Sequence, residues 1–327
     1  MNSELFEKIC RKLKLGELKY QPESLKGGLT HKMYSLFTSE GKYAVKLLNP
    51  YIMKRNTAMG NYRTAEELEL KLEQHGIPIV PALIFNGKKM QEIDGQYFYL
   101  FDWYEGKRLK NEEITVAHCR EIGKYLAAIH SIERQEAECE RDEIHIDWDF
   151  YIDKMKSQDK ELHSLLLHNR QLFYESQEKG NLAIKKIPAV QSICHNDMDS
   201  KNVLWKGEEC RIIDLESLSF FSSFIELYEV ALCWSGYEIC NINYDFMREL
   251  IHSYAESGGE LPTDWETIYY SNYGRLEWLE HNIKRVLGID CAEDERELGV
   301  SEVRETTAHV IYYDKEREKI LNCLNSI

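Results

Sequence analysis

The segment from Ile193 to Glu216 places three oxygen-bearing side chains at a spacing that suits chemistry on phosphate. It predicts a short apolar strand, a polar loop, and a hairpin whose second strand ends just before Asp214. A hairpin brings residues at the start of one strand and the end of the other together. Asp197 can accept a hydroxyl proton, whereas Asn202 and Asp214 offer the hard oxygen ligands that Mg²⁺ prefers. The segment therefore predicts a phosphoryl-transfer site.

Two further residues of this segment have expected supporting roles. The ring of His195 can hydrogen-bond the loop backbone and hold Asp197 in place. Glu216 lies two residues beyond Asp214, where it can orient metal-bound water or meet a cationic group of a substrate. The alternative interpretation is an acidic, amide-rich loop on a surface hairpin, and the apolar strands on both sides favour the catalytic one.

Composition limits the class of protein. The 327 residues suffice for two lobes around a cleft, and no run of eighteen apolar residues is present to span a bilayer. Nine cysteines are scattered without a Cys-x-x-Cys pair, and the first fifteen residues lack an apolar signal core, so we expect a cytoplasmic protein. A net charge of −15 argues against nucleic-acid binding. That charge is compatible with a cationic substrate, although solubility explains it equally well.

The order of predicted elements indicates an α+β protein with two lobes. A β-rich N-terminal lobe is expected over residues 1–102, and a mostly helical C-terminal lobe over residues 103–327. The expected helices and strands of the first lobe are the helices 3–15 and 64–75 and the strands 33–37, 42–47, 80–85 and 96–103. In the second lobe we expect helices ending near residue 130, over 150–156, 162–177 and 220–234, and two closing helices over 244–257 and 265–287.

The spacing His-x-Asp-x4-Asn followed by Ile-Asp-x-Glu resembles the loop of the aminoglycoside phosphotransferase and choline kinase family. Gly-Gly-Leu-Thr at 27–30, Ala-Val-Lys at 44–46 and Lys-Tyr-Leu-Ala-Ala-Ile-His at 124–130 extend the resemblance over most of the chain. It implies a protein-kinase-like fold that uses ATP, or GTP, with Mg²⁺. The expected reaction moves the γ-phosphate to a hydroxyl of a small molecule, such as an amino sugar, choline, ethanolamine or homoserine.

The same resemblance assigns residues to the nucleotide. Lys46 would reach the α and β phosphates, and a glutamate of the following helix would pair with it. Glu66 is the expected partner, with Glu67 and Glu69 as alternatives because the helical register is uncertain by one turn. Without the resemblance, Lys46 would read as an edge-strand lysine with its ammonium in solvent.

Two loops complete the expected nucleotide site. Gly28 and Thr30 belong to the glycine-containing turn, where backbone N–H groups can approach an anion closely. His31 departs from the family pattern, in which asparagine is common at that position. Asp102 and Tyr104 belong to the predicted hinge, whose extended backbone can meet the edge of adenine.

The substrate pocket is less well defined by the sequence. Glu216, Trp234, Trp278 and Glu280 are candidates, because carboxylates and aromatic faces suit an ammonium group. His130 is expected to be structural. Two other functions remain open: a protein kinase or regulatory partner, and a catalytically silent nucleotide-binding module. Asp-Leu-Glu at 214–216 in place of Asp-Phe-Gly, without a following Ala-Pro-Glu, argues against the protein kinase. The sequence leaves the oligomeric state open.

Overall fold

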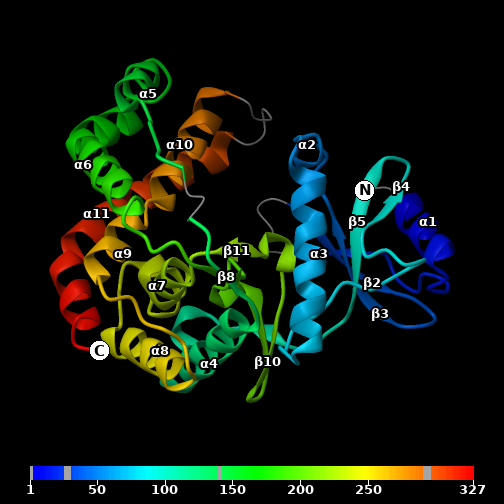
Figure 1. Cartoon of the computed structure of the whole chain (residues 1–327). Helices are drawn as coiled ribbons and strands as arrows, with labels where there is room; N and C mark the ends of the chain where they lie inside the picture. Colours follow the sequence, from blue (N-terminus) through cyan, green and yellow to red (C-terminus); the bar gives the residue numbers. More distant parts are fainter. Residues whose placement is uncertain (1–2, 26–30, 139–141, 290–295) are drawn as a thin grey trace. The chain divides into compact units, whose positions relative to one another are not determined.

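The computed structural model describes residues 3–25, 31–138, 142–289 and 296–327. The chain forms two compact units (Figure 1). The first consists of Met1–Glu112 and His195–Ser219, and the second of Glu113–Cys194 and Phe220–Ile327. The loop and hairpin that carry the predicted chemistry therefore fold with the N-terminal part of the chain. The division into lobes at residues 102 and 103 stays a prediction.

An antiparallel five-stranded sheet forms the centre of the first unit, in the order β1-β2-β3-β5-β4. The strands β2 and β3 match the predicted pair, and β5 ends one residue earlier than expected. In the register, Lys46 of β3 lies between Met33 of β2 and Tyr99 of β5. The strands are β1 (Glu23–Leu25), β2 (Lys32–Phe37), β3 (Lys42–Leu47), β4 (Gln91–Ile93) and β5 (Gln96–Asp102).

The predicted strand over 80–85 is wrong. This segment makes isolated bridges, Ala82 to Phe101 and Phe85 to Lys88, instead of a continuous ladder. Pro78 and Pro81 supply the reason, because proline has no N–H to donate to a neighbouring strand. The segment still crosses the unit, since Val80 N donates to Ile212 O of the catalytic hairpin at 2.9 Å.

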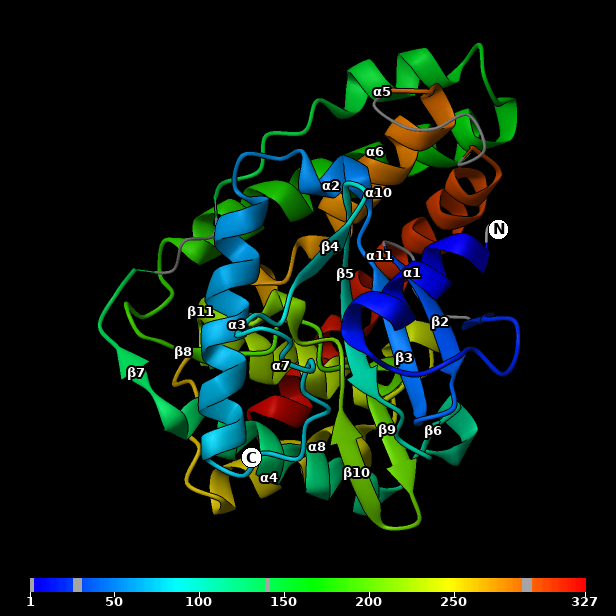
Figure 2. The same ribbon diagram turned by 90° about the vertical axis from the view of Figure 1, so that its right-hand side faces the viewer.

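Two helices cover this sheet and the catalytic hairpin. Helix α1 (Ser3–Leu13) lies beside the sheet (Figure 2). It buries Phe6 and Ile9 in one core with the sheet residues Leu36 and Phe98. Helix α3 (Ala58–Gln74) begins six residues before the predicted start and packs on the short 3₁₀ helix η3 (Leu215–Ser217). The short helix α2 (Pro50–Met53) precedes α3.

The predicted catalytic hairpin is present. Strands β9 (Val203–Lys206) and β10 (Glu209–Ile212) pair antiparallel, with Val203 opposite Ile212, and β6 (Lys107–Arg108) adds a third strand beside β9. The pairing extends one step further, because Ile213 N donates to Asn202 O at 2.9 Å. Asn202 and Asp214 therefore lie at the same end of the hairpin.

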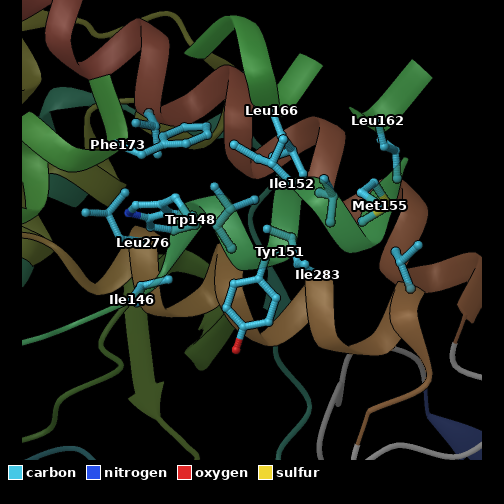
Figure 3. Close-up of a cluster of buried hydrophobic side chains, with 14 of the residues drawn as sticks. Ile146, Trp148, Tyr151, Ile152, Met155, Leu162, Leu166, Phe173, Leu276 and Ile283 are labelled. Atoms are coloured by element: carbon cyan, nitrogen blue, oxygen red, sulfur yellow. The ribbon is translucent and has the colours of Figure 1, made fainter. Parts of the chain in front are cut away.

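The second unit is helical around a small sheet in the order β11-β8-β7. Helices α5, α6 and α10 share one buried hydrophobic core (Figure 3). Within it, the ring centroids of Trp148 and Phe173 are 5.0 Å apart. The strands are β7 (Arg134–Gln135), β8 (Gln191–Cys194) and β11 (Ser219–Phe221). The helices are α4 (Val116–Ile132), α5 (Trp148–Met155), α6 (Lys160–Ile184), α7 (Ser223–Trp234), α8 (Tyr244–Glu256), α9 (Trp265–Ser271), α10 (Gly274–Leu287) and α11 (Arg296–Leu324).

Two predictions for this unit need correction. The single closing helix expected over 265–287 is broken into α9 and α10 at Asn272 and Tyr273, where Asn272 leaves the helical conformation with ψ of 71°. The 29-residue helix α11, which packs along α10, was not predicted. Within the described ranges, no helix is both long and apolar enough to cross a lipid bilayer.

Candidate active site

The predicted catalytic loop, His195 to Asn202, holds the Asp197 carboxylate from two sides. Asn202, only 2% exposed, donates its side-chain N–H groups to the Asp197 carbonyl and to Asp197 Oδ2, both at 2.8 Å. Lys201 Nζ lies 3.1 Å from Asp197 Oδ1 and 2.6 Å from Asp199 Oδ2. Burial raises the pKa of Asp197 above its ordinary value, and the Lys201 ammonium offsets this only in part. A carboxylate fixed in this way, with a raised pKa, suits proton acceptance.

His195 is fully buried beneath this loop. The backbone N–H of Asp197 donates to its Nδ1 at 3.3 Å, so the ring hydrogen is on Nε2 and is donated to the Ile213 carbonyl at 3.1 Å. The ring therefore connects the loop backbone at Asp197 to the residue before Asp214. This is the geometry that a loop-supporting histidine requires.

Lys46, Asp214 and Glu216 form a charge cluster at the end of the hairpin. Lys46 is 6% exposed, and its ammonium forms close ion pairs with both carboxylates. Burial alone would raise the pKa of Asp214, but Lys46 outweighs burial and holds that pKa below its ordinary value. Burial would likewise lower the pKa of Lys46, and the two carboxylates raise it instead. Lys46 and Asp214 are therefore both charged at neutral pH.

Asp214 carries its carboxylate on left-handed backbone, with φ of 66° and ψ of 53°. This conformation is unusual for a residue with a Cβ atom, and aspartate and asparagine tolerate it better than most. It ends β10 abruptly and starts η3, which turns Glu216 back toward Lys46. Backbone strain of this kind is often found at functional sites.

The expected pairing of Lys46 with a glutamate of α3 is not formed. Glu66 Oε1 accepts from Met90 N at 3.1 Å and from the Tyr99 hydroxyl at 2.9 Å. Glu69 accepts from Ala82 N at 2.6 Å and pairs with Lys89, and Glu67 is exposed. Glu66 and Glu69 thus bind α3 to the segment before β4. The carboxylate partners of Lys46 are Asp214 and Glu216, at the end of the hairpin.

The glycine-containing turn is described only from His31 onward, so Gly28 and Thr30 lie outside the described residues. His31 is buried between β2 and α3. Its Nδ1 accepts from Asn49 N at 2.9 Å, and its Nε2 lies 3.1 Å from the Tyr62 hydroxyl and 3.0 Å from Glu216 Oε1. The residue that departs from the family pattern therefore touches the charge cluster through Glu216.

The hinge residues lie where β5 ends. Asp102 is the last residue of β5 and is exposed, opposite Tyr43 in the register. Tyr104 is half-buried, with the Arg211 guanidinium 5.6 Å from its ring. The backbone N–H of Trp103 is already bonded to Lys42 O at 3.2 Å. Contact of Asp102 and Tyr104 with adenine stays a prediction.

Three of the predicted substrate residues lie in the helical unit and have partners there. Trp234 is 0% exposed and is a core residue of α7, so it offers no surface to a ligand. Trp278 donates its indole N–H to Glu302 at 3.0 Å. Glu280 accepts from the Tyr151 hydroxyl at 2.6 Å and pairs with Lys284 at 2.9 Å. Of the predicted substrate residues, only Glu216 belongs to the charge cluster around Lys46.

A recess in the helical unit was missed by the sequence analysis. It encloses about 570 Å³ including its open mouth, and tyrosine rings line much of it. Tyr269 and Tyr313 stack at 4.3 Å, and the Arg275 guanidinium lies 5.1 Å from the Tyr237 ring. Exposed Glu175 and Asp314 stand at its rim. The two Tyr-Tyr pairs at 269–270 and 312–313 were the sequence signal for it.

A buried polar cluster lies under the strand that leads into the catalytic loop. His130 Nε2 is 2.7 Å from Glu226 Oε2, and His130 Nδ1 is 2.9 Å from the Tyr254 hydroxyl. Cys194 Sγ lies 3.7 Å from His130 Nε2 and donates to Phe221 O at 3.4 Å. Because these hydrogen bonds satisfy the buried groups, the cluster fits the expected structural role of His130.

The donor set at the hairpin end fits a hard divalent cation. Both side-chain N–H groups of Asn202 donate hydrogen bonds to Asp197, which leaves the side-chain amide oxygen to bind a metal ion. Asp214 adds an ionised carboxylate, and the residue before it, Ile213, is hydrogen-bonded to the backbone of Asn202. An amide oxygen and a carboxylate are ligands that Mg²⁺ prefers.

Comparison with known proteins identifies a family for the chain. The model of the phosphotransferase enzyme family matches residues 23–240. No curated protein matches the chain by sequence.

The solved structures that resemble the chain include small-molecule kinases. Spectinomycin phosphotransferase, in complex with ADP and spectinomycin, is 15% identical, with a TM-score of 0.71, covering 95% of this chain and 98% of that one. An ethanolamine kinase from Plasmodium vivax is 13% identical, with a TM-score of 0.58 and coverage of 93% and 89%. A choline kinase from Cryptosporidium parvum Iowa II is 15% identical, with a TM-score of 0.53 and coverage of 98% and 97%. These likenesses confirm the predicted kinase-like α+β fold.

Proposed function

The chain belongs to the phosphotransferase enzyme family, and we propose that it transfers the γ-phosphate of ATP to a hydroxyl group of a small molecule, with Mg²⁺. One observation carries the proposal. Within the first unit, Lys46 pairs with Asp214, while Asn202 joins Asp197 to the same end of the hairpin. A cation for phosphate, two oxygen donors for metal and a carboxylate base are the parts that phosphoryl transfer uses.

Each residue has a distinct part in the proposed reaction. Asn202 and Asp214 would hold Mg²⁺, which when bound neutralises charge on the phosphates. Lys46 would contact phosphate oxygens. Asp197 would accept the proton of the substrate hydroxyl and orient its oxygen, and the bonds from Asn202 keep that carboxylate in one position. His195 would keep the loop in register with the hairpin.

The acceptor is proposed to bear an amine. The chain's net charge of −15 suits a cationic ligand, and the relatives named for ethanolamine and choline act on amino alcohols.

A phosphorylation screen tests the function. ATP and GTP would be tried with amino alcohols, aminoglycosides including spectinomycin, and homoserine, and bulk protein would be the competing acceptor. Transfer to a small alcohol that depends on Asp197 supports the proposal. Transfer only to protein would support the protein-kinase alternative. Nucleotide binding without transfer to any acceptor would support the silent module.

A further inference from the structure

The neighbours of His31 determine which ring nitrogen carries its hydrogen. The side chain is 3% exposed, and the backbone N–H of Asn49 donates to Nδ1 across 2.9 Å. Because a backbone N–H is always a donor, Nδ1 must present its lone pair. The hydrogen of the neutral ring is therefore on Nε2. In a doubly protonated ring, the hydrogen on Nδ1 would point at the N–H hydrogen of Asn49.

The Nε2–H group lies against two oxygens. It hydrogen-bonds the Tyr62 hydroxyl at 3.1 Å, and Glu216 Oε1 lies 3.0 Å from the same nitrogen. The second carboxylate oxygen of Glu216, Oε2, pairs with Lys46. Glu216 thus lies between the His31 ring, which approaches one carboxylate oxygen, and the lysine that pairs with the other.

The candidates on α3 do not compete for this position. Glu66 is bonded to Met90 and Tyr99, and Glu69 to Ala82 and Lys89. Asp214, the other partner of Lys46, is also the proposed metal ligand. Glu216 is therefore the carboxylate that can still pair with Lys46 when Asp214 binds the metal ion.

We propose that His31 is a positioning residue, which as the Nε2–H tautomer orients Glu216 so that this carboxylate, in place of Glu66, aligns Lys46 for the phosphates of the nucleotide. The proposal rests on the proposed function, because it takes Lys46 to contact phosphate. It gives a physical role to the histidine that stands where relatives commonly have asparagine.

Two substitutions of His31 separate its contact with Asn49 from its contact with Glu216. In His31→Gln the side-chain N–H can still reach Glu216, but the acceptor for Asn49 is lost. In His31→Asn an acceptor remains near the position of Nδ1, but the shorter amide cannot reach Glu216. Affinity for ATP with Mg²⁺, measured by titration calorimetry, should fall about tenfold in His31→Asn and by no more than about threefold in His31→Gln. The opposite order would overturn the proposal, because it would reduce His31 to a support for the Asn49 backbone.

The identity of the aligning carboxylate is tested in the same assay. Glu216→Gln should weaken ATP binding by about tenfold and more than Glu66→Gln does, because Glu216 pairs with Lys46 and Glu66 is bonded to Met90 and Tyr99 instead. Glu92→Gln, an exposed residue of β4, is the matched control. A larger loss in Glu66→Gln than in Glu216→Gln would overturn the proposal, and so would a wild-type protein that does not bind ATP.

A spectroscopic measurement tests the contact without nucleotide. In protein labelled with ¹⁵N-histidine, the His31 signals are those that disappear in His31→Gln. They should show a hydrogen on Nε2 and none on Nδ1, and the Nε2–H proton should move upfield in Glu216→Gln but not in Glu92→Gln. An Nδ1–H or doubly protonated ring at pH 7 would overturn the proposal. If these results and the affinities hold while no acceptor is phosphorylated, the proposed function fails and the role of His31 stands.

Discussion

Asn202 donates two hydrogen bonds of 2.8 Å to Asp197, one to its carbonyl and one to its carboxylate. The same asparagine accepts through its backbone carbonyl from Ile213, the residue before Asp214. One buried residue, through its side chain and its backbone carbonyl, thus connects the proposed base to the residue before the proposed metal ligand. Substitutions of Asp197 and of Asp214 should therefore have different effects on activity.

Asp197→Asn should lower kcat by about 10²- to 10⁴-fold, because an amide cannot accept the substrate proton. The affinity for ATP should change little, since Asp197 is assigned to the acceptor hydroxyl. Steady-state kinetics and calorimetry would measure the two effects, with Asp153→Asn, an exposed residue of α5, as the control. Equal kcat in Asp197→Asn and wild type would contradict the base assignment.

Asp214→Asn should raise the Mg²⁺ concentration that gives half-maximal activity by about tenfold or more, because the metal loses a charged ligand. The fold should persist, since asparagine accepts left-handed backbone and Lys46 keeps Glu216 as a partner. Activity measured against Mg²⁺ concentration provides the test, together with circular dichroism. The assignment of Asp214 would be lost if the metal dependence matched that of the wild type.

Cysteine labelling should follow burial. Burial raises the pKa of Cys119 to about 12, so at pH 8 roughly one thiol in ten thousand is ionised. Because the thiolate is the nucleophile, iodoacetamide should leave Cys119 unmodified in the native protein, and its labelling should increase as pH rises toward that pKa. Half-buried Cys240 should react sooner. Peptide mass spectrometry with and without urea measures this, and prompt native labelling of Cys119 would contradict the packing of α4.

His130→Leu should lower the free energy of unfolding by about 3 kcal/mol, because Glu226 would lose its imidazole partner while staying buried. Urea unfolding monitored by tryptophan fluorescence measures this, and His145→Leu, at an exposed position, is the control. Equal stability of the two variants would show that the buried cluster is not structural.

The hairpin site was predictable from sequence because it is local. Asn202 and Asp214 are twelve positions apart, and the turn between two apolar strands is enough to bring them together. The carboxylate partner of Lys46 was not predictable in this way. The helical pattern of α3 is correct, but the direction of Glu66 depends on Met90 and Tyr99, which fold against it from a separate segment.

Helix α11 shows why the end of the chain could not be predicted. Its apolar positions are sparse, and Gly299 reads as a helix breaker. In the structure Gly299 lies against α10, where an added Cβ would stand 2.9 Å from Arg285 Cβ. The glycine is needed for close packing between helices, and that requirement appears only when both helices are in place.

The left-handed backbone at Asp214 also restricts how this site can change by mutation. Most side chains would strain the turn, whereas asparagine, reached from aspartate codons by a single nucleotide change, would keep it. The easiest well-folded descendant of this protein is therefore one with a neutral residue at position 214. Weaker metal binding with retention of shape is therefore only one mutational step away.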